Sequence, residues 1–182
     1  MIRKLLEMTS ATLLILLLLP FFTIIFVVAA LSFNSSGIFL QTRIGQHGKP
    51  FTIYKFRTIK NGQVTQFGKF LRKTKLDELP QLFNILRGDM TFVGPRPDVP
   101  GYYDQLKGND RRVLALQPGL TSLAALKYRN EEALLKQQKD PKAYNDTVIF
   151  PDKIAMNLEY LEKRSLTYDL KIIWLTFISL FK

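Results

Sequence analysis

The chain has 182 residues, with 26 Lys and Arg against 15 Asp and Glu, and a formal net charge of +11. This length suits one domain with a hydrophobic core and is too short for two domains of ordinary size. Because it has no cysteine and only one histidine, His47, disulfides, a thiolate nucleophile and a His-based metal cage are excluded. Any bound metal would be a hard, oxygen-liking ion, which describes Mg²⁺.

The positive charge is concentrated in residues 43–112, which hold fourteen basic and six acidic residues. Such a field indicates an anionic partner, namely a phosphate ester, a nucleic acid or an acidic lipid surface. A stacking platform for nucleic acid would need aromatic residues interleaved with the basic ones, and the sequence lacks that pattern. We therefore expect no nucleic acid partner.

Residues 8–42 carry no charge, and Ala11–Phe33 is almost purely apolar. As one helix these 23 residues would measure about 35 Å at ~1.5 Å per residue, enough to cross a hydrocarbon core of roughly 30 Å. The run is longer than the apolar stretch of about 7–15 residues in a cleaved signal peptide. The sequence therefore predicts a membrane location.

Pro20 lies in the middle of this segment. A mid-helix proline frees one carbonyl and tends to kink the helix. The segment is then either an ordinary kinked span or a re-entrant helix that enters and leaves by the same face. Basic residues flank both ends of the segment, so the positive-inside rule does not tell which end faces the cytoplasm. On the residues alone the simple span is favoured, because spans are much commoner.

The last residues, Leu170–Lys182, form a second apolar stretch that is too short to span. Its Trp174, Phe177 and Phe181 are bracketed by Lys171 and Lys182. This pattern is typical of an interfacial amphipathic helix lying among lipid headgroups. A core helix of the soluble part explains it equally well.

Between the two apolar segments, residues 49–59 alternate as a strand does, and Asn61-Gly62 signals a turn. Residues 74–90 predict a helix with one apolar face that ends at Gly88. Residues 91–103 contain three prolines and predict a rigid irregular loop. Short helical pieces are expected in 104–120 and 130–146, and one helical region in 151–175. The fold class expected is an α-helix-dominated α+β domain.

Two adjacent carboxylates, Asp77 and Glu78, precede Pro80 by two to three residues. Proline is tolerated in the first turn of a helix, so the helix would begin with Asp77 as N-cap or Glu78 at the first position. The two acids would then stabilise the positive end of the helix dipole by about 1–2 kcal/mol. This explanation requires no catalysis.

The surrounding cations favour a second explanation. Arg72 and Lys75 stand just ahead of the pair, and Arg96 follows in the Gly-Pro-Arg-Pro loop. Cations near a helix N-terminus form phosphate sites. One carboxylate could attack phosphorus to give an acyl phosphate, while its neighbour holds Mg²⁺. The pair therefore resembles a reaction centre more than a cap.

Five sequence blocks resemble, in order, the bacterial sugar transferase family of small monotopic polyprenyl-phosphate phosphoglycosyl transferases. They are the apolar N-terminus, IYKFRT (Ile53–Thr58), FGKFLRKTKLDELPQLFNILRGDMTFVGPRP (Phe67–Pro97), PGLT (Pro118–Thr121) and YDLKIIWLT (Tyr168–Thr176). The resemblance covers nearly the whole chain, and the longest block is highly specific.

The resemblance implies transfer of a sugar 1-phosphate from a nucleoside diphosphate sugar, usually a UDP-sugar, to polyprenyl phosphate, with release of UMP. It implies that Asp77 is the nucleophile and forms a covalent phosphosugar intermediate, and that Glu78 is its partner, linked to Mg²⁺, so that both acids are candidate metal ligands. The other implied substrate-binding residues are Arg72, Pro95, Arg96, Pro97, Lys55 and Arg57. Asp169 matches a recurring acid with a structural or supporting role.

The family also implies that residues 1–36 form a re-entrant membrane helix broken at Pro20. Residues 37–182 would then form a cytoplasmic catalytic domain on the bacterial inner membrane, which includes the C-terminal interfacial helix. Leu19-Pro20 replaces the Ser-Pro that is common in the family, and Thr23 could supply the missing hydroxyl. Residues 122–130 replace most of a run that borders the sugar in the family, so the sugar is not predicted. Neither is the oligomeric state.

Two other functions compete with this one. A membrane-tethered anion-binding protein would use the basic segment without catalysis. A metal-dependent phosphatase with an aspartyl nucleophile would usually carry Asp-x-Asp, which is absent here, and it has no need of a lipid-facing segment.

Overall fold

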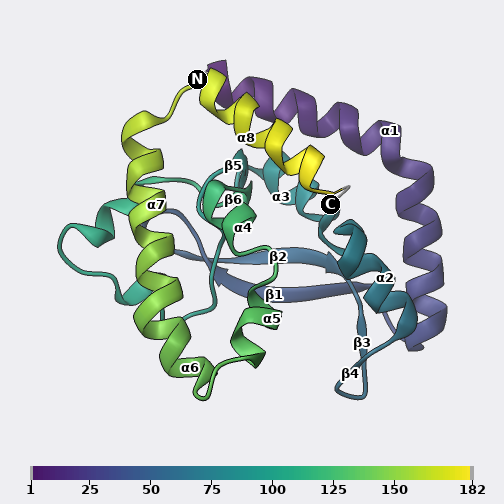
Figure 1. The fold of residues 1–182 in the computed structure, drawn as a ribbon. Helices are drawn as coiled ribbons and strands as arrows, with labels where there is room; N and C mark the ends of the chain where they lie inside the picture. Colours follow the sequence, from purple (N-terminus) through teal and green to yellow (C-terminus); the bar gives the residue numbers. More distant parts are fainter. Residues whose placement is uncertain (1, 181–182) are drawn as a thin grey trace. The chain divides into compact units, whose positions relative to one another are not determined.

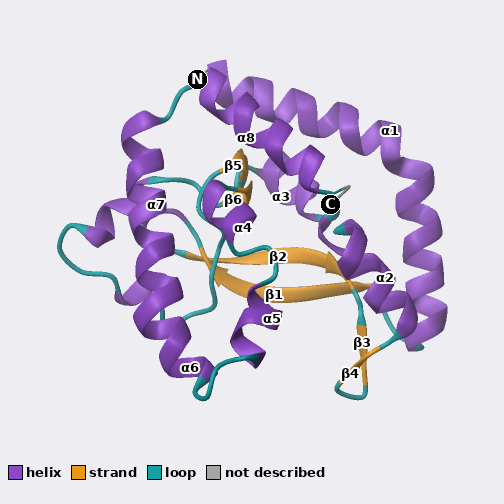
Figure 2. Cartoon of the chain, in the orientation of Figure 1, coloured by secondary structure: helices purple, strands orange, loops and turns teal. Residues whose placement is uncertain are grey.

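The computed structural model describes residues 2–180 (Figure 1). Helices dominate and the strands are few and short (Figure 2), which confirms the helix-rich α+β class. The chain forms two compact units. The first contains the described residues up to Arg43 together with Pro50–Met90, and the second contains Ile44–Lys49 and the described residues from Thr91 onward. Phe181 and Lys182 of the predicted interfacial segment lie outside the described residues.

The first unit is built from a long helix, two short antiparallel strand pairs and two shorter helices. Its elements are α1 (Ile2–Phe33), β1 (Ile38–Ile44), β2 (Pro50–Phe56), β3 (Ile59–Lys60), β4 (Gln63–Val64), α2 (Gln66–Thr74), a 3₁₀ turn (Leu76–Glu78) and α3 (Gln81–Arg87). The last residue of β1, Ile44, belongs to the second unit.

Helix α1 continues through Pro20 and is about 48 Å long at ~1.5 Å per residue. It bends about midway along its length (Figure 1), as a mid-helix proline predicts. The Thr23 Oγ1 hydroxyl donates to the carbonyl oxygen of Leu19 at 3.0 Å, so this threonine does bond the turn around the proline. Within residues 2–180, α1 is the one helix long and apolar enough to cross a membrane, by length and composition.

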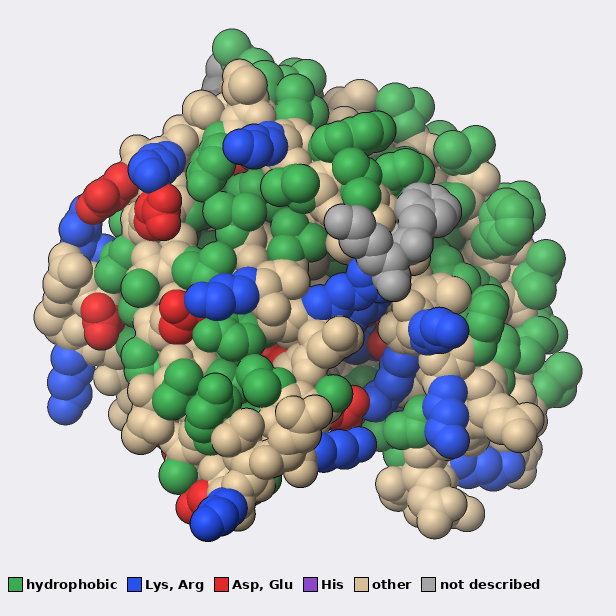
Figure 3. All heavy atoms as spheres, in the orientation of Figure 1, with side chains coloured by type: hydrophobic (Ala, Val, Ile, Leu, Met, Phe, Trp, Pro, Cys, Tyr) green, Lys and Arg blue, Asp and Glu red, His purple; other side chains and the backbone are tan. Residues whose placement is uncertain are grey.

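One side of α1 is buried and the other is exposed and apolar. The buried positions recur every three to seven residues along one stripe: Ala11, Ile15, Phe22, Ile25, Ala29 and Phe33. At mid-helix, the Phe22 ring lies 5.8 Å from the rings of both Phe56 in β2 and Phe83 in α3. Large apolar side chains are exposed along much of the remaining helix surface, as the face drawn in Figure 3 shows. This is the surface that a membrane-associated helix presents.

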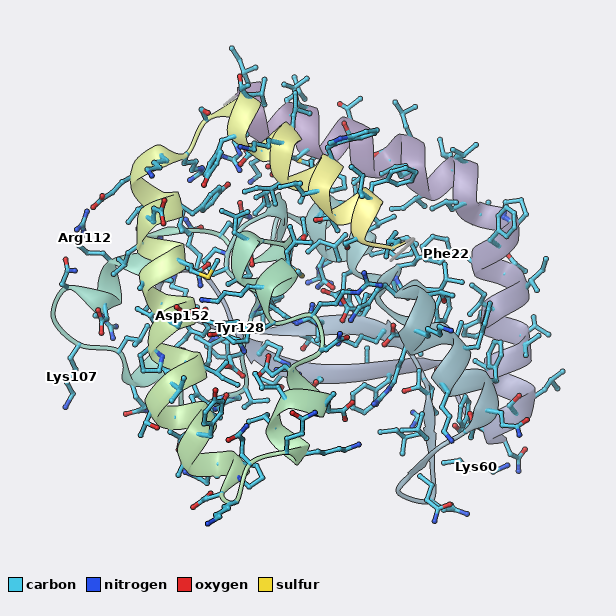
Figure 4. All side chains as sticks on the ribbon, in the orientation of Figure 1. Phe22, Lys60, Lys107, Arg112, Tyr128 and Asp152 are labelled. Carbon is cyan, nitrogen blue, oxygen red and sulfur yellow. The ribbon has the colours of Figure 1, made fainter. Side chains whose placement is uncertain are left out.

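Two polar anchors fix the other elements of the first unit. The buried Asn84 of α3 accepts from the Tyr54 N–H at 3.1 Å and donates to the Thr52 carbonyl at 2.7 Å, which ties α3 to β2. The β3–β4 hairpin turns at Asn61-Gly62, both with positive φ, as predicted. Its Lys60 Nζ donates to the Ser32 carbonyl at 2.8 Å, at the C-terminal end of α1 (Figure 4).

The second unit consists of short helices and one parallel strand pair, followed by two longer helices. Its elements are β5 (Thr91–Val93), β6 (Gly119–Thr121), α4 (Leu123–Lys127), α5 (Glu131–Lys136), α6 (Pro141–Tyr144), a π-helix (Asn145–Ile149), α7 (Phe150–Lys163), α8 (Leu166–Ser179), and 3₁₀ turns at Gln46–Gly48, Tyr103–Gln105 and Asp110–Ala115.

The prediction that residues 91–103 contain no regular element was wrong at its start. Thr91 pairs with Gly119 and Val93 with Thr121 in a parallel ladder. These residues precede the first proline of the loop, so nothing prevents them from pairing. The ladder ends where Gly94 passes Gly119 so closely that a Cβ on Gly119 would lie 2.1 Å from the Gly94 nitrogen. Only glycine fits there.

The single helical region expected over residues 151–175 is two helices. Arg164 leaves helical geometry, and the Ser165 hydroxyl caps α8 by accepting from the Tyr168 N–H at 3.2 Å. Ile172 of α8 is buried in a core cluster with Val93, Leu116 and Tyr160. Trp174 and Phe177 stack on each other and are exposed. The helix thus has both a core face and an exposed apolar face, and its interfacial role stays a prediction.

Candidate active site

The two adjacent acids do not cap a helix, so the expected helix start was wrong. Lys75 has left-handed backbone geometry (φ 59°, ψ 13°) and ends α2. Asp77 and Glu78 follow in the 3₁₀ turn, and α3 begins at Gln81 with Pro80 before it. The fixed φ of Pro80, −60°, suits the entry to α3. The acids therefore sit one turn ahead of the helix, with no side-chain capping bond at either helix start.

Asp77 is buried without the hydrogen bonds that a buried carboxylate normally has. It is 8% exposed, and its Oδ1 has no hydrogen-bond partner among the described residues. Burial raises the pKa of Asp77 above its usual value, and the neighbouring Glu78 raises it further. The charges of Lys55, Lys75 and Arg72 act in the opposite direction. A buried acid with a raised pKa and an unsatisfied oxygen is a feature of functional sites.

The partner acid Glu78 is equally buried, and it is paired. Its Oε1 lies 3.3 Å from the Nζ of Lys55 in β2. Arg72, in the last turn of α2, donates from Nε to the Thr58 Oγ1 at 3.0 Å. Other Lys and Arg side chains gather over α2 (Figure 3). The structure thus brings four predicted residues together: Asp77, Glu78, Lys55 and Arg72.

Arg57, also predicted to bind substrate, is engaged elsewhere. Its Nε donates to the Ser36 carbonyl at 3.0 Å and its Nη2 to the Ile38 carbonyl at 3.4 Å. Its guanidinium also lies 5.9 Å from the centre of the Phe39 ring. These contacts hold the segment between α1 and β1. Within the described chain no hydrogen bond joins Arg57 to the acid pair, and its substrate-binding role stays a prediction.

Pro95, Arg96 and Pro97 belong to the second unit, in the loop after β5. Both prolines are buried and Arg96 between them is exposed, while the rigidity of this loop stays a prediction. The Pro95 carbonyl accepts from the Gly119 N–H at 2.9 Å. The loop lines a small, shallow hollow whose other walls include Tyr103 and Leu114. Arg96 is therefore presented at the edge of a concave surface.

The residues present are compatible with Mg²⁺ held partly by substrate. No group of three or more Asp, Glu or His side chains within residues 2–180 could hold a metal by itself. Mg²⁺ is usually bound by one or two carboxylates plus substrate phosphate oxygens. Glu78 and the unpartnered Asp77 Oδ1 supply such a donor set.

Thr58 and Tyr160 were not predicted from the sequence to have a role, and both have clear structural functions. Thr58 is buried and accepts the Arg72 hydrogen bond. Tyr160 donates to Asp169, and both are buried. The Asp169 bond fits the structural role expected of it. Thr58 could have been noticed because it closes the IYKFRT block, whereas nothing local marks Tyr160.

Comparison with known proteins identifies the family of the chain. Residues 1–182 match the model of the family described as bacterial sugar transferase. A UDP-glucose:undecaprenyl-phosphate glucose-1-phosphate transferase of Caulobacter vibrioides is 33% identical, over 98% of this chain and 69% of the relative. The enzyme of that name from Escherichia coli strain K12 is 32% identical, over 93% of this chain.

A Bacillus subtilis protein named as an uncharacterized sugar transferase, EpsL, is 31% identical over 96% of this chain and 85% of its own length. The chain spans 38% of the length of the Escherichia coli relative. The match to the family model covers the whole sequence. The chain therefore belongs to the bacterial sugar transferase family.

Proposed function

We propose that the chain is a phosphoglycosyl transferase that moves a sugar 1-phosphate from a nucleoside diphosphate sugar, namely a UDP-sugar, to polyprenyl phosphate. The observation that carries this proposal is Asp77, a buried carboxylate with an unpartnered oxygen, beside Glu78 and its Lys55 partner. Several relatives are named for this transfer with UDP-glucose and undecaprenyl phosphate. Such a reaction would initiate the assembly of a bacterial glycan.

In the first step, the Asp77 carboxylate attacks the phosphorus that carries the sugar. A bond forms from the carboxylate oxygen to phosphorus, the bond from phosphorus to the bridging oxygen breaks, and UMP leaves with the electron pair. Burial makes Asp77 the more reactive because it removes the water that would stabilise the carboxylate. The cations of Lys55 and Arg72 offset the negative charge that the substrate brings.

In the second step, a phosphate oxygen of polyprenyl phosphate attacks the same phosphorus. The bond between phosphorus and the Asp77 oxygen breaks, which regenerates the carboxylate and gives a polyprenyl diphosphate sugar. Mg²⁺, when held by Glu78, Asp77 and substrate phosphate, supplies neutralisation of the phosphate charge. Lys55 keeps Glu78 oriented through the 3.3 Å contact.

The structure of α1 supports a re-entrant rather than a spanning arrangement. Phe22 lies in the middle of the apolar segment and contacts Phe56 and Phe83, in elements that immediately flank the acid pair in the fold. In a simple span the middle of the helix would lie about 15 Å from the membrane surface. The nucleotide sugar is water-soluble, so the acid pair must be reachable from water. A bent helix at one face satisfies both requirements.

The reaction is tested with purified full-length protein, Mg²⁺, undecaprenyl phosphate and a panel of UDP-sugars. UMP release and a lipid-linked diphosphate sugar are expected with at least one donor. No UMP with any donor would overturn the proposed function. Because the chain has no cysteine, a cysteine introduced at Ile2 should react with a membrane-impermeant reagent only from the cytoplasmic side.

A further inference from the structure

Lys75 has an unusual backbone conformation for its residue type. Among the described residues, four that are not glycine have positive φ: Asn34, His47, Asn61 and Lys75. Asparagine and histidine are enriched in this region because they tolerate it well. Lysine has no such advantage, because its Cβ lies too close to the neighbouring carbonyl oxygen in the left-handed region. Strain of this kind is retained where the surroundings or the function require it.

The backbone of Lys75 explains why the left-handed geometry is needed, but not why the residue is a lysine. Its N–H donates to the Arg72 carbonyl at 3.3 Å and ends α2, while its carbonyl accepts from the Glu78 N–H at 3.2 Å and starts the acid-bearing turn. Glycine or asparagine would serve both bonds with less strain. What lysine adds is its charged side chain.

That charge is available to a ligand. Of the three cations that act on Asp77, Lys55 contacts Glu78 and Arg72 donates to Thr58. The exposed Lys75 ammonium has no hydrogen bond or ion pair with any residue from 2 to 180. Its charge nevertheless reaches Asp77, where it lowers the pKa. An exposed cation therefore lies two residues from a buried carboxylate whose Oδ1 has no hydrogen-bond partner among the described residues.

We propose that Lys75 is a further substrate-binding residue, whose ammonium contacts the diphosphate of the nucleotide sugar and neutralises the charge that builds on the departing nucleotide phosphate. This assignment rests on the proposed function. A lysine is a compact charge on a flexible stem, so it can follow the phosphate as the bridging bond breaks. The two tied cations hold fixed positions, whereas Lys75 can move with the leaving group.

The test compares Lys75→Asn with Lys75→Arg and with Lys69→Asn. Asparagine accepts the left-handed backbone, so Lys75→Asn should unfold at the same temperature as the wild type or slightly higher. Arginine keeps the charge. Lys69 is an exposed lysine of α2 that is not among the cations acting on Asp77, which makes its variant the control for losing one surface charge.

We expect Lys75→Asn to raise the KM for the best UDP-sugar about 10-fold, the loss of one charge-assisted hydrogen bond. Lys75→Arg should stay within about threefold of the wild type, since the charge is kept. Lys69→Asn should leave the KM for the UDP-sugar unchanged.

The outcomes separate this assignment from the proposed function. An active wild type whose Lys75→Asn variant keeps the wild-type KM for the UDP-sugar would overturn the assignment alone. Equal effects of Lys75→Asn and Lys69→Asn would also overturn it, because a general surface field would then explain the loss. A wild type inactive with every donor would overturn the proposed function, and the assignment with it.

Discussion

Asp77 in the first unit and Asp169 in the second are both buried carboxylates, 8% and 6% exposed. Asp169 accepts a hydrogen bond from the Tyr160 hydroxyl, which also lies 3.1 Å from the Val93 carbonyl oxygen. Asp77 has an oxygen with no partner and a neighbouring acid that raises its pKa. The two acids differ in the satisfaction of their hydrogen bonds, not in burial.

This difference separates a structural acid from a reactive one. A buried carboxylate that is hydrogen-bonded stabilises the fold around it, whereas an unsatisfied one costs stability and is kept for another reason. Substitutions at the two sites should therefore have opposite effects. At Asp77 activity should be lost and stability gained, whereas loss of the Tyr160–Asp169 bond should lower stability and leave activity.

Asp77→Asn should lower turnover by at least about 10³-fold, since an amide cannot act as the nucleophile. The same change should stabilise the protein near pH 7. Because the folded-state pKa of Asp77 is raised, the ionised acid destabilises the fold above that pKa and the penalty vanishes below the usual value. A gain of about 1 kcal/mol would raise the Tm by roughly 2–4 °C. A lower Tm would mean that the ionised Asp77 stabilises the fold, which contradicts its raised pKa.

Glu78→Gln should reduce kcat/KM by about 10- to 100-fold and raise the Mg²⁺ concentration needed for half-maximal activity. The amide keeps the shape of the side chain but loses the charge that attracts both Mg²⁺ and Lys55. A Mg²⁺ titration of the two proteins measures the effect. An unchanged Mg²⁺ requirement would remove Glu78 from the set of metal ligands.

The wild-type pH profile provides a smaller and graded effect. The pKa of Asp77 is raised above its usual value of 3.8. As the pH decreases below this raised pKa, kcat/KM should fall about tenfold per pH unit. This acid limb of the profile reports the free enzyme and is measured from initial rates at low donor concentration. Its absence down to pH 3.8, with the protein still folded, would contradict the raised pKa.

Tyr160→Phe should lower the free energy of unfolding by about 1–3 kcal/mol, because the buried Asp169 loses its donor. Assayed well below the Tm, kcat/KM should remain within about twofold of the wild type. Thermal unfolding and initial rates measure the two effects. A large loss of activity without loss of stability would mean that Asp169 is not merely structural.

Much of the first unit was predictable from the sequence. The apolar stretch gave α1, Asn61-Gly62 gave the hairpin turn, and the family blocks identified Asp77, Glu78, Lys55 and Arg72, which the fold brings together. The helix-start rule failed at Asp77 because a lysine takes up the left-handed conformation and starts a separate turn. Residue preferences place lysine inside helices, so they do not foresee this break.

The second unit was less predictable because its contacts are distant in sequence. Strands β5 and β6 are three residues each, too short for a periodic pattern, and they pair in parallel across about 28 residues. The Tyr160 to Asp169 bond depends on the turn at Ser165, which splits one apparent helix into two. Such pairings follow from the fold as a whole.

The central claim is that Asp77 becomes covalently modified during the reaction. Full-length protein incubated with Mg²⁺ and its best UDP-sugar, without polyprenyl phosphate, is analysed by intact mass and by peptide mapping. The account predicts a sugar phosphate adduct on the peptide that carries Asp77, absent from Asp77→Asn and discharged when undecaprenyl phosphate is added. An active enzyme that forms product without any adduct on Asp77 would contradict it.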